Sequence, residues 1–241
     1  MQTDYNSLFV SREEREDHWI SISDLMAGLM MIFMFIAISY MVKVSIESQQ
    51  IKDIAITYEI LQTELYEDLL AEFKSDLARW NAEIDRATLS VKFKEPEVLF
   101  EAGQSRLQPR FEDILQSFFP RYVNILMGDK YQNEIEEVRI EGHTSSEWEN
   151  ATPMQSYFNN MQLSQDRTRS VLEYVMTLKG AFNGVKKKWL IEHVTANGLS
   201  YSHRVFTRET DKEDRKGSRR VEFRVRTKAE KRIARILGKE V

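Results

Sequence analysis

The most apolar stretch of the chain, residues 25–42, reads LMAGLMMIFMFIAISYMV. It holds no charged residue, and only Ser39 and Tyr40 carry polar side-chain atoms. Apolar residues continue on both sides, so a helix over 20–44 contains about 25 residues and spans a bilayer core of roughly 30 Å. The sequence therefore predicts a single transmembrane helix over residues 20–44.

A signal peptide and a buried core helix are the alternative interpretations of this stretch. A signal peptide begins with basic residues and ends at a small-residue cleavage site. Here acidic residues outnumber Arg12 and Arg15, and no such site follows. A buried helix needs apolar partners on every side, which the polar remainder of the chain does not offer. We expect residues 1–19 to form a polar N-terminal arm, although Lys43 and Lys52 offset the two arginines and leave the orientation open.

Asp24 lies at the start of the predicted membrane helix. A carboxylate costs roughly 2.5–3.5 kcal/mol at the bilayer centre and less near an end, so it needs a function or a partner. Apolar surroundings favour its neutral form, which suits a group that takes up and releases ions. Capping of the helix start is the other interpretation. Residues around Asp24 are expected to pack against a neighbouring helix or to line a channel: Ser21, Ser23, Ala27, Gly28 and Met31.

Residues 45–86 are polar but carry apolar residues at steps of three or four, which predicts an amphipathic helix. The helix either packs on the chain's own domain or forms a stalk that pairs with a second copy, and we favour the stalk. The apolar positions are Ile54, Tyr58, Leu61, Leu65, Leu69, Phe73, Leu77, Trp80 and Ile84.

Strand and helix patterns alternate over residues 87–228, so we expect an α+β fold in which a βαβαβ mixed sheet forms the C-terminal domain. The predicted strands are 89–93, 137–141, 190–196 and 220–226. The predicted helices are 111–127, with Pro120 kinking or splitting it, and 164–178, with Ser164 as its N-cap. Residues 229–241 are expected to be a basic helical tail.

Composition argues against several classes of function. The net charge of −4 gives no basic field for direct binding of nucleic acid. The chain has no cysteine, and its four histidines lack the spacing of metal ligands. Nucleophile and phosphate-binding motifs are also missing. We therefore predict no catalytic residue, no metal and no cofactor.

Four segments, taken in order, resemble the motifs of OmpA-like domains. They are Glu97-Val-Leu-Phe-Glu-Ala-Gly103, Ile140-Glu-Gly-His-Thr144, Asn160-Met-Gln-Leu-Ser-Gln-Asp-Arg167 and Gly217-Ser-Arg-Arg-Val-Glu-Phe223. The resemblance covers about 140 residues and implies a domain that binds peptidoglycan.

The segment from Trp19 to Phe33, WISISDLMAGLMMIF, resembles the membrane helix of MotB-family stator B subunits. It is most similar to the B subunits of Zorya anti-phage systems. The resemblance implies an inner-membrane homodimer inside a ring of five A subunits, with the N-terminus cytoplasmic and the C-terminal domain periplasmic. Asp24 would carry H⁺ or Na⁺, and the motor would serve defence against phage. A flagellar stator subunit and a passive wall anchor are the alternatives.

The resemblance also assigns the residues that would bind the wall peptide. Arg167 would bind a diaminopimelate carboxylate through a bidentate fork, unless it only forms a surface salt bridge. Ser145 stands where the family carries an aspartate, and Glu147 or Glu149, in a loop expected over 146–159, are candidates to replace it. A structural role for Arg220 is equally open. We call the following six the predicted wall-binding residues: Thr144, Ser145, Asn160, Leu163, Arg167 and Arg220.

Overall fold

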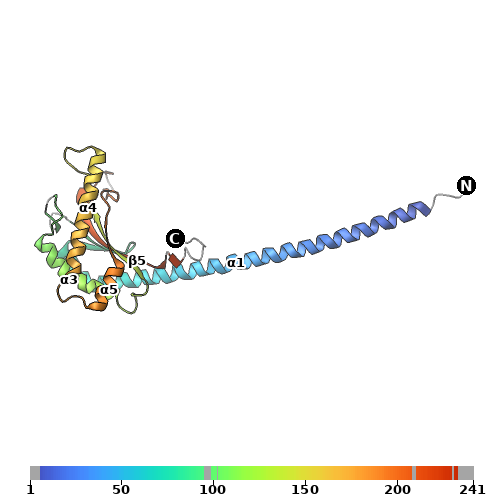
Figure 1. Cartoon of the computed structure of the whole chain (residues 1–241), viewed down its shortest axis with the longest axis horizontal. Helices are drawn as coiled ribbons and strands as arrows, with labels where there is room; N and C mark the ends of the chain where they lie inside the picture. The colour runs from blue at the N-terminus through green and yellow to red at the C-terminus, as the bar shows by residue number, and fades with distance from the viewer. Residues whose placement is uncertain (1–5, 95–98, 102, 208–209, 230, 233–241) are drawn as a thin grey trace.

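The computed structural model describes residues 6–94, 99–101, 103–207, 210–229 and 231–232, and for residues 6–18, 20 and 21 it describes the backbone alone. One helix, α1 (Asn6–Trp80), has 75 residues, which corresponds to about 112 Å at 1.5 Å per residue. It projects far beyond the C-terminal part of the chain (Figure 1). The predicted arm from Asn6 onward, the membrane segment and most of the stalk therefore form one uninterrupted helix.

The apolar side chains in the first half of α1 are exposed. Phe33 is 60% and Met41 70% accessible, although a helix this apolar is normally covered by protein or lipid. Within the described residues, α1 is the one helix that is long and apolar enough to cross a membrane. It gives the chain a single-pass membrane anchor.

The second half of α1 packs into the domain. Leu65, Leu69 and Phe73 are at most 1% exposed and belong to the hydrophobic core. The helix ends at Trp80 because Asn81 adopts a left-handed conformation with φ of 50°, as residues that follow a helix C-terminus often do. The predicted helical stalk is confirmed, but the helix ends at Trp80 instead of residue 86. Its second half packs on the chain's own domain, which was the alternative interpretation.

Five strands form one mixed sheet in the order β1-β2-β5-β3-β4. Strands β3 and β4 are parallel, and the other neighbouring pairs are antiparallel. The predicted α+β fold is confirmed, but β1 takes Ile84 out of the expected helix. The strands are β1 (Ala82–Asp85), β2 (Ser90–Lys94), β3 (Ile135–His143), β4 (Val194–Gly198) and β5 (Arg220–Thr227).

The remaining helices are α3 (Pro109–Leu126), α4 (Pro153–Met176), α5 (Gly184–His193) and α6 (Arg215–Ser218). Helix α3 continues through Pro120 and is not split. Helix α4 begins at a capping box formed by Thr152 and Gln155, well before the predicted N-cap at Ser164. The loop expected over 146–159 is therefore wrong in its second half, which belongs to α4. The strand expected over 190–196 is wrong in its first half, because α5 extends to His193. Most of the predicted basic tail lies outside the described residues.

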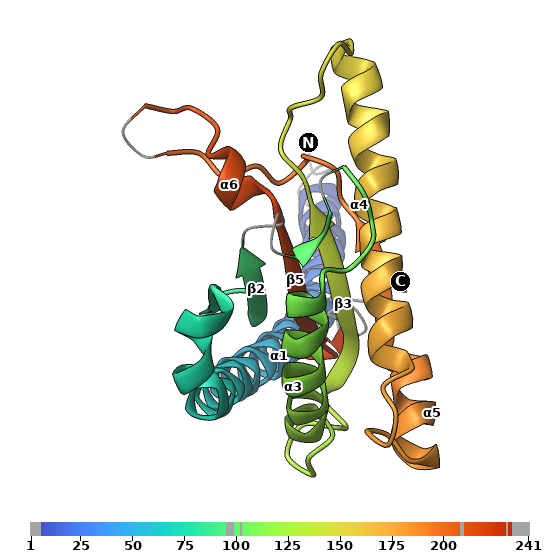
Figure 2. The ribbon, with the colours of Figure 1, turned by 90° about the vertical axis from the view of Figure 1, so that its left-hand side faces the viewer.

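Three helices cover one face of the sheet. Phe118 on α3 lies 5.1 Å from the ring of Phe73 on α1, 5.1 Å from Phe93 on β2 and 5.1 Å from Phe223 on β5. In Figure 2, α3 lies in front of the sheet, with α4 on one side of it and the end of α1 on the other. The opposite face carries charged pairs such as Lys92–Asp85, at 2.6 Å. This packing fixes α4 against the ends of β3 and β4, where the candidate site lies.

Candidate functional site

Helix α4 approaches β3 and β4 very closely. A Cβ atom on Gly142 would lie 2.8 Å from the carbonyl oxygen of Ser164, and one on Gly198 would lie 2.4 Å from the backbone nitrogen of Gln165. Side chains at these two positions are excluded by backbone atoms of α4. The two glycines therefore let α4 lie against the ends of the strands, and they bring the loop after β3 next to the first turns of the helix.

Hydrogen bonds join that loop to α4. Thr144 donates its backbone N–H to the carbonyl oxygen of Ser200 at 2.9 Å, and the N–H of Ser200 donates to Oγ of Ser164 at 3.0 Å. Oγ of Ser156 donates to the carbonyl oxygen of Ser146 at 2.9 Å. The loop is thereby held at two levels of the same helix.

Five of the six predicted wall-binding residues lie on this loop or on α4. Asn160 is buried and donates from Nδ2 to the carbonyl oxygen of Ser156 at 3.0 Å. Leu163 is half-buried on the same helix. Thr144 is 3% exposed, and its hydroxyl has no hydrogen-bond partner among the described residues. A buried hydroxyl without a partner is costly, so this group is available to a ligand.

Arg167 is the most unusual of these residues. Its side chain is buried, its Nε donates to the carbonyl oxygen of Gln104 at 2.9 Å, and its guanidinium lies 4.9 Å from the ring centre of Phe100. No carboxylate lies within ion-pair distance among the described residues, so Arg167 does not form the surface salt bridge that was its alternative interpretation. Burial, helped by the nearby charge of Arg219, lowers the pKa of Arg167 to about 10. A buried cation without a counter-charge favours an anionic ligand.

Arg220 is not brought to Arg167. Successive side chains of a strand point to opposite faces, and Arg220 faces away from α4. Its Nε donates to Glu222 at 2.6 Å and its Nη1 to the carbonyl oxygens of Ser218 and His203 at 3.1 and 3.2 Å. These contacts give Arg220 a structural role within the domain. Arg219, which precedes Arg220 and was considered with it as a less certain candidate, is the residue whose charge acts on Arg167.

A compact group of ionisable residues lies on the face of the sheet away from α4. Nε2 of His143 is 3.8 Å from Glu141 and 3.6 Å from Glu222, an arrangement of the kind that metal ions bind. Arg220 already contacts Glu222, and Arg224 lies 4.0 Å from Glu141. These cations balance the two carboxylates and would repel a divalent ion. We interpret the group as a buried ionic network, in which burial lowers the pKa of His143 and keeps its ring neutral.

The acidic residues near Ser145 differ in what they contact. Ser145 itself is buried. Glu147 pairs with Arg215 at 3.1 Å, and Glu149 is exposed. Glu213, which the sequence did not single out, accepts hydrogen bonds from the backbone N–H of Ser146 at 2.9 Å and from its hydroxyl. The loop after β3 is therefore also held from the segment that precedes α6.

The second candidate site lies on the exposed half of α1. Asp24, Leu25, Gly28, Leu29 and Ile32 line a shallow surface hollow, because Gly28 has no side chain and nothing fills the space beside it. Ser23, Ala27 and Met31 are also exposed. The side chain of Ser21 lies outside the described residues.

Comparison with known proteins identifies the family. The chain matches the OmpA family over residues 99–218. It is also 49% identical to the Zorya protein ZorB of Escherichia coli strain Crooks, over 227 residues that cover 94% of each chain. The chain belongs to the ZorB family. Because the ZorB match extends over nearly the whole chain, it includes both the membrane helix and the domain, and it confirms the predicted relationship.

Solved structures resemble the domain of this ZorB-family chain at low identity. A protein described as MotB-like from Desulfovibrio vulgaris is 22% identical, with a TM-score of 0.46, and the match covers 75% of this chain and 94% of that one. The cell wall anchor of the type VI secretion system from Pseudomonas aeruginosa is 21% identical, with a TM-score of 0.43, over 67% and 96% of the two chains. The periplasmic domain of Helicobacter pylori MotB is 15% identical, with a TM-score of 0.39, over 61% and 83%.

Proposed function

We propose that this chain is the B subunit of an ion-driven, MotB-like motor in the bacterial inner membrane, and that the motor serves defence against phage. One observation carries the proposal. A single unbroken helix joins Asp24, on an exposed apolar surface, to a domain that buries Arg167 with no counter-charge among the described residues. Asp24 is suited to an ion path through the membrane. Arg167 is suited to an anionic ligand that belongs to the cell wall.

In this proposal the domain grips peptidoglycan. The guanidinium of Arg167 binds a carboxylate of the wall peptide through a bidentate fork, and this contact supplies the negative charge that the buried side chain lacks. The free hydroxyl of Thr144 and the amide of Asn160 form hydrogen bonds with the peptide backbone, and Leu163 contacts its apolar part. Phe100 stacks on the guanidinium and holds it in place.

The membrane end performs the ion work. Two copies of the chain pair inside a ring of five A subunits, with their N-termini in the cytoplasm and their domains in the periplasm. The hollow beside Gly28 receives a helix of the A ring, and Asp24 passes H⁺ or Na⁺ along that contact. Because the domains are fixed to the wall, ion flow turns the ring around a stationary axle.

Wall binding is tested with the full-length chain in detergent and isolated sacculi. We expect Arg167→Gln to abolish co-sedimentation with sacculi. Arg169→Gln is the matched control, because Arg169 lies two residues along the same helix, is exposed and pairs with Glu173 at 2.8 Å. Loss of binding in both variants, or in neither, contradicts the proposed role of Arg167.

Ion transport is tested with the chain co-purified with its A subunit. Asp24→Asn keeps the size of the side chain but cannot ionise, so we expect the complex to assemble and to lose ion flux in liposomes and protection against phage in cells. Ser39→Ala is the matched control, because Ser39 is exposed on the same helix but outside the predicted channel residues; it should retain ion flux and protection. A passive wall anchor predicts that Asp24→Asn retains full protection, and that result refutes the motor.

A further inference from the structure

Glu213 precedes α6 and contacts the loop after β3, which in turn contacts the start of α4. Its carboxylate accepts from the N–H and the hydroxyl of Ser146, and the carbonyl oxygen of Ser146 accepts from Oγ of Ser156. Nδ2 of Asn160 donates to the same serine, to its carbonyl oxygen at 3.0 Å and to Oγ at 3.3 Å. A continuous set of hydrogen bonds therefore leads from Glu213 to Asn160.

Glu213 is also an acid without a salt bridge. Glu147 pairs with Arg215, and Glu222 pairs with Arg220. No lysine, arginine or histidine lies within ion-pair distance of the Glu213 carboxylate in the part of the chain that the structure describes. Both of its hydrogen bonds come from neutral groups of Ser146, so its negative charge remains uncompensated while the side chain is half-buried.

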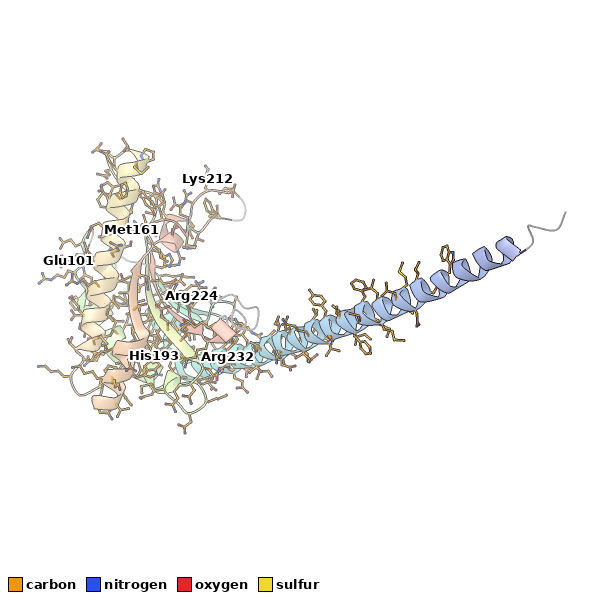
Figure 3. The ribbon with its side chains drawn as sticks, turned by 45° about the vertical axis from the view of Figure 1, so that its right-hand side comes forward. Glu101, Met161, His193, Lys212, Arg224 and Arg232 are labelled. Atoms are coloured by element: carbon orange, nitrogen blue, oxygen red, sulfur yellow. The ribbon has the colours of Figure 1, made fainter. Side chains whose placement is uncertain are left out.

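The two uncompensated charges lie at different levels of α4. Glu213 is linked through Ser146 to Ser156 on α4. Ser156 precedes Arg167 by eleven residues, which corresponds to roughly 16 Å along the helix. Figure 3 places Met161, next to Asn160, and Lys212, next to Glu213, toward the same end of the domain, far from His193. A ligand spanning both charges is an extended peptide with a carboxylate at one end and an ammonium group toward the other.

We propose that Glu213 is a specificity-determining residue that pairs with the ammonium group of the wall peptide. This inference rests on the proposed peptidoglycan binding and names the part of the ligand that Glu213 recognises. Glu213 supplies the negative charge that Ser145 lacks. Of the two glutamates suggested by the sequence, Glu147 is already paired with Arg215. Glu149 is exposed and no hydrogen bond among the described residues holds its side chain in place, whereas Ser146 holds Glu213.

The test compares native sacculi with sacculi whose free amines are acetylated, using the full-length chain in detergent. We expect the unchanged chain to bind native sacculi about fivefold more tightly, the effect of one partly exposed ion pair. Glu213→Gln can still accept the hydrogen bond from the Ser146 N–H through its amide oxygen and donate from its NH2 group to the Ser146 hydroxyl. It carries no charge, so it should bind both kinds of sacculi equally. Glu149→Gln should keep the fivefold preference.

Ser146→Ala separates charge recognition from support of the loop. This variant loses the hydroxyl contact but keeps the Glu213 charge, so the preference for native sacculi should persist. A purely structural role predicts that Ser146→Ala and Glu213→Gln behave alike, and this outcome overturns the inference, as does a preference retained by Glu213→Gln. If the unchanged chain binds both kinds of sacculi equally and Arg167→Gln binds neither, the inference fails while the proposed function stands. If the unchanged chain binds neither, both fail.

Discussion

The continuity of α1 predicts that the rotational phase of the helix, more than its length, links the membrane end to the domain. The perturbation is an insertion of alanines between Ser48 and Gln49. Both residues are exposed, and the neighbouring pairs Lys43–Glu47 and Gln49–Asp53 lie on either side, so neither pair is broken. Alanine favours the helix more than any other residue. The insertion therefore lengthens and turns α1 without interrupting it.

The geometry of the α-helix sets the size of the effect. Each added residue turns the helix by about 100° and lengthens it by about 1.5 Å. Two alanines rotate Asp24 by roughly 200° relative to the domain but add only about 3 Å. Seven alanines add about 10.5 Å but leave the phase within roughly 20° of the original. The two insertions therefore separate rotation from length.

We expect the seven-residue insertion to retain activity and the two-residue insertion to lose it. Leu65, Leu69 and Phe73 lock the end of α1 into the core, so a turn introduced at Ser48 must appear at Asp24. If two domains are fixed as a pair on the wall, both Asp24 side chains then face away from the ring. The assay is plaque formation in cells that carry the complete system, with co-purification of the A subunit as a control for assembly. Equal activity of the two insertions refutes a torsionally rigid α1.

Three further predictions concern the domain. Phe73→Ala should lower the free energy of unfolding by about 3–5 kcal/mol in a denaturant titration, whereas Ile56→Ala, on the exposed part of the same helix, should change it by less than about 0.5 kcal/mol. Gly198→Ala should cost about 3 kcal/mol because its Cβ meets the backbone of α4, whereas Gly184→Ala, with open space around it, should not destabilise the domain. The folded-state pKa of His143 is lowered by burial from its ordinary value of 6.5, so its contribution to stability is present above pH 6.5 and is lost as the pH falls below that value; His143→Gln should flatten this part of the pH profile, and an unchanged slope contradicts the reasoning.

The parts of the fold that depend on apolar periodicity could be predicted from the sequence. The membrane helix is a continuous apolar run, and α3 and β5 bury apolar residues that recur at the helical and strand periods. The first turns of α4 could not be found in this way, because the side chains they turn inward are polar: Ser156, Asn160 and Ser164. The capping-box residues Thr152 and Gln155 were the local sequence feature that could have located the start of α4.

The site shows a similar division. Arg167 and Asn160 were predicted from the resemblance alone, and the structure buries both on α4. Glu213 has no such signal, because it lies far along the chain from Ser146. The tertiary fold brings the two together, in a segment where Glu213 pairs with Phe206 ahead of α6. Contacts of this kind depend on the tertiary fold, and no local pattern records them.

The same reasoning bears on how force passes through the molecule. In the proposed motor, torque at Asp24 would reach the domain through α1, and the end of that helix is part of the hydrophobic core that also positions α3 and the sheet. Arg121 on α3 adds to this connection, since it binds Glu72 at 2.6 Å and Asp76 at 2.8 Å on α1 and lies 4.8 Å from the ring of Phe73. Rotation of the helix therefore has to disrupt the core before it can slip past the domain. In the proposed motor, a domain joined through an unpacked linker would let the axle turn with the ring, whereas this packing would hold the axle stationary.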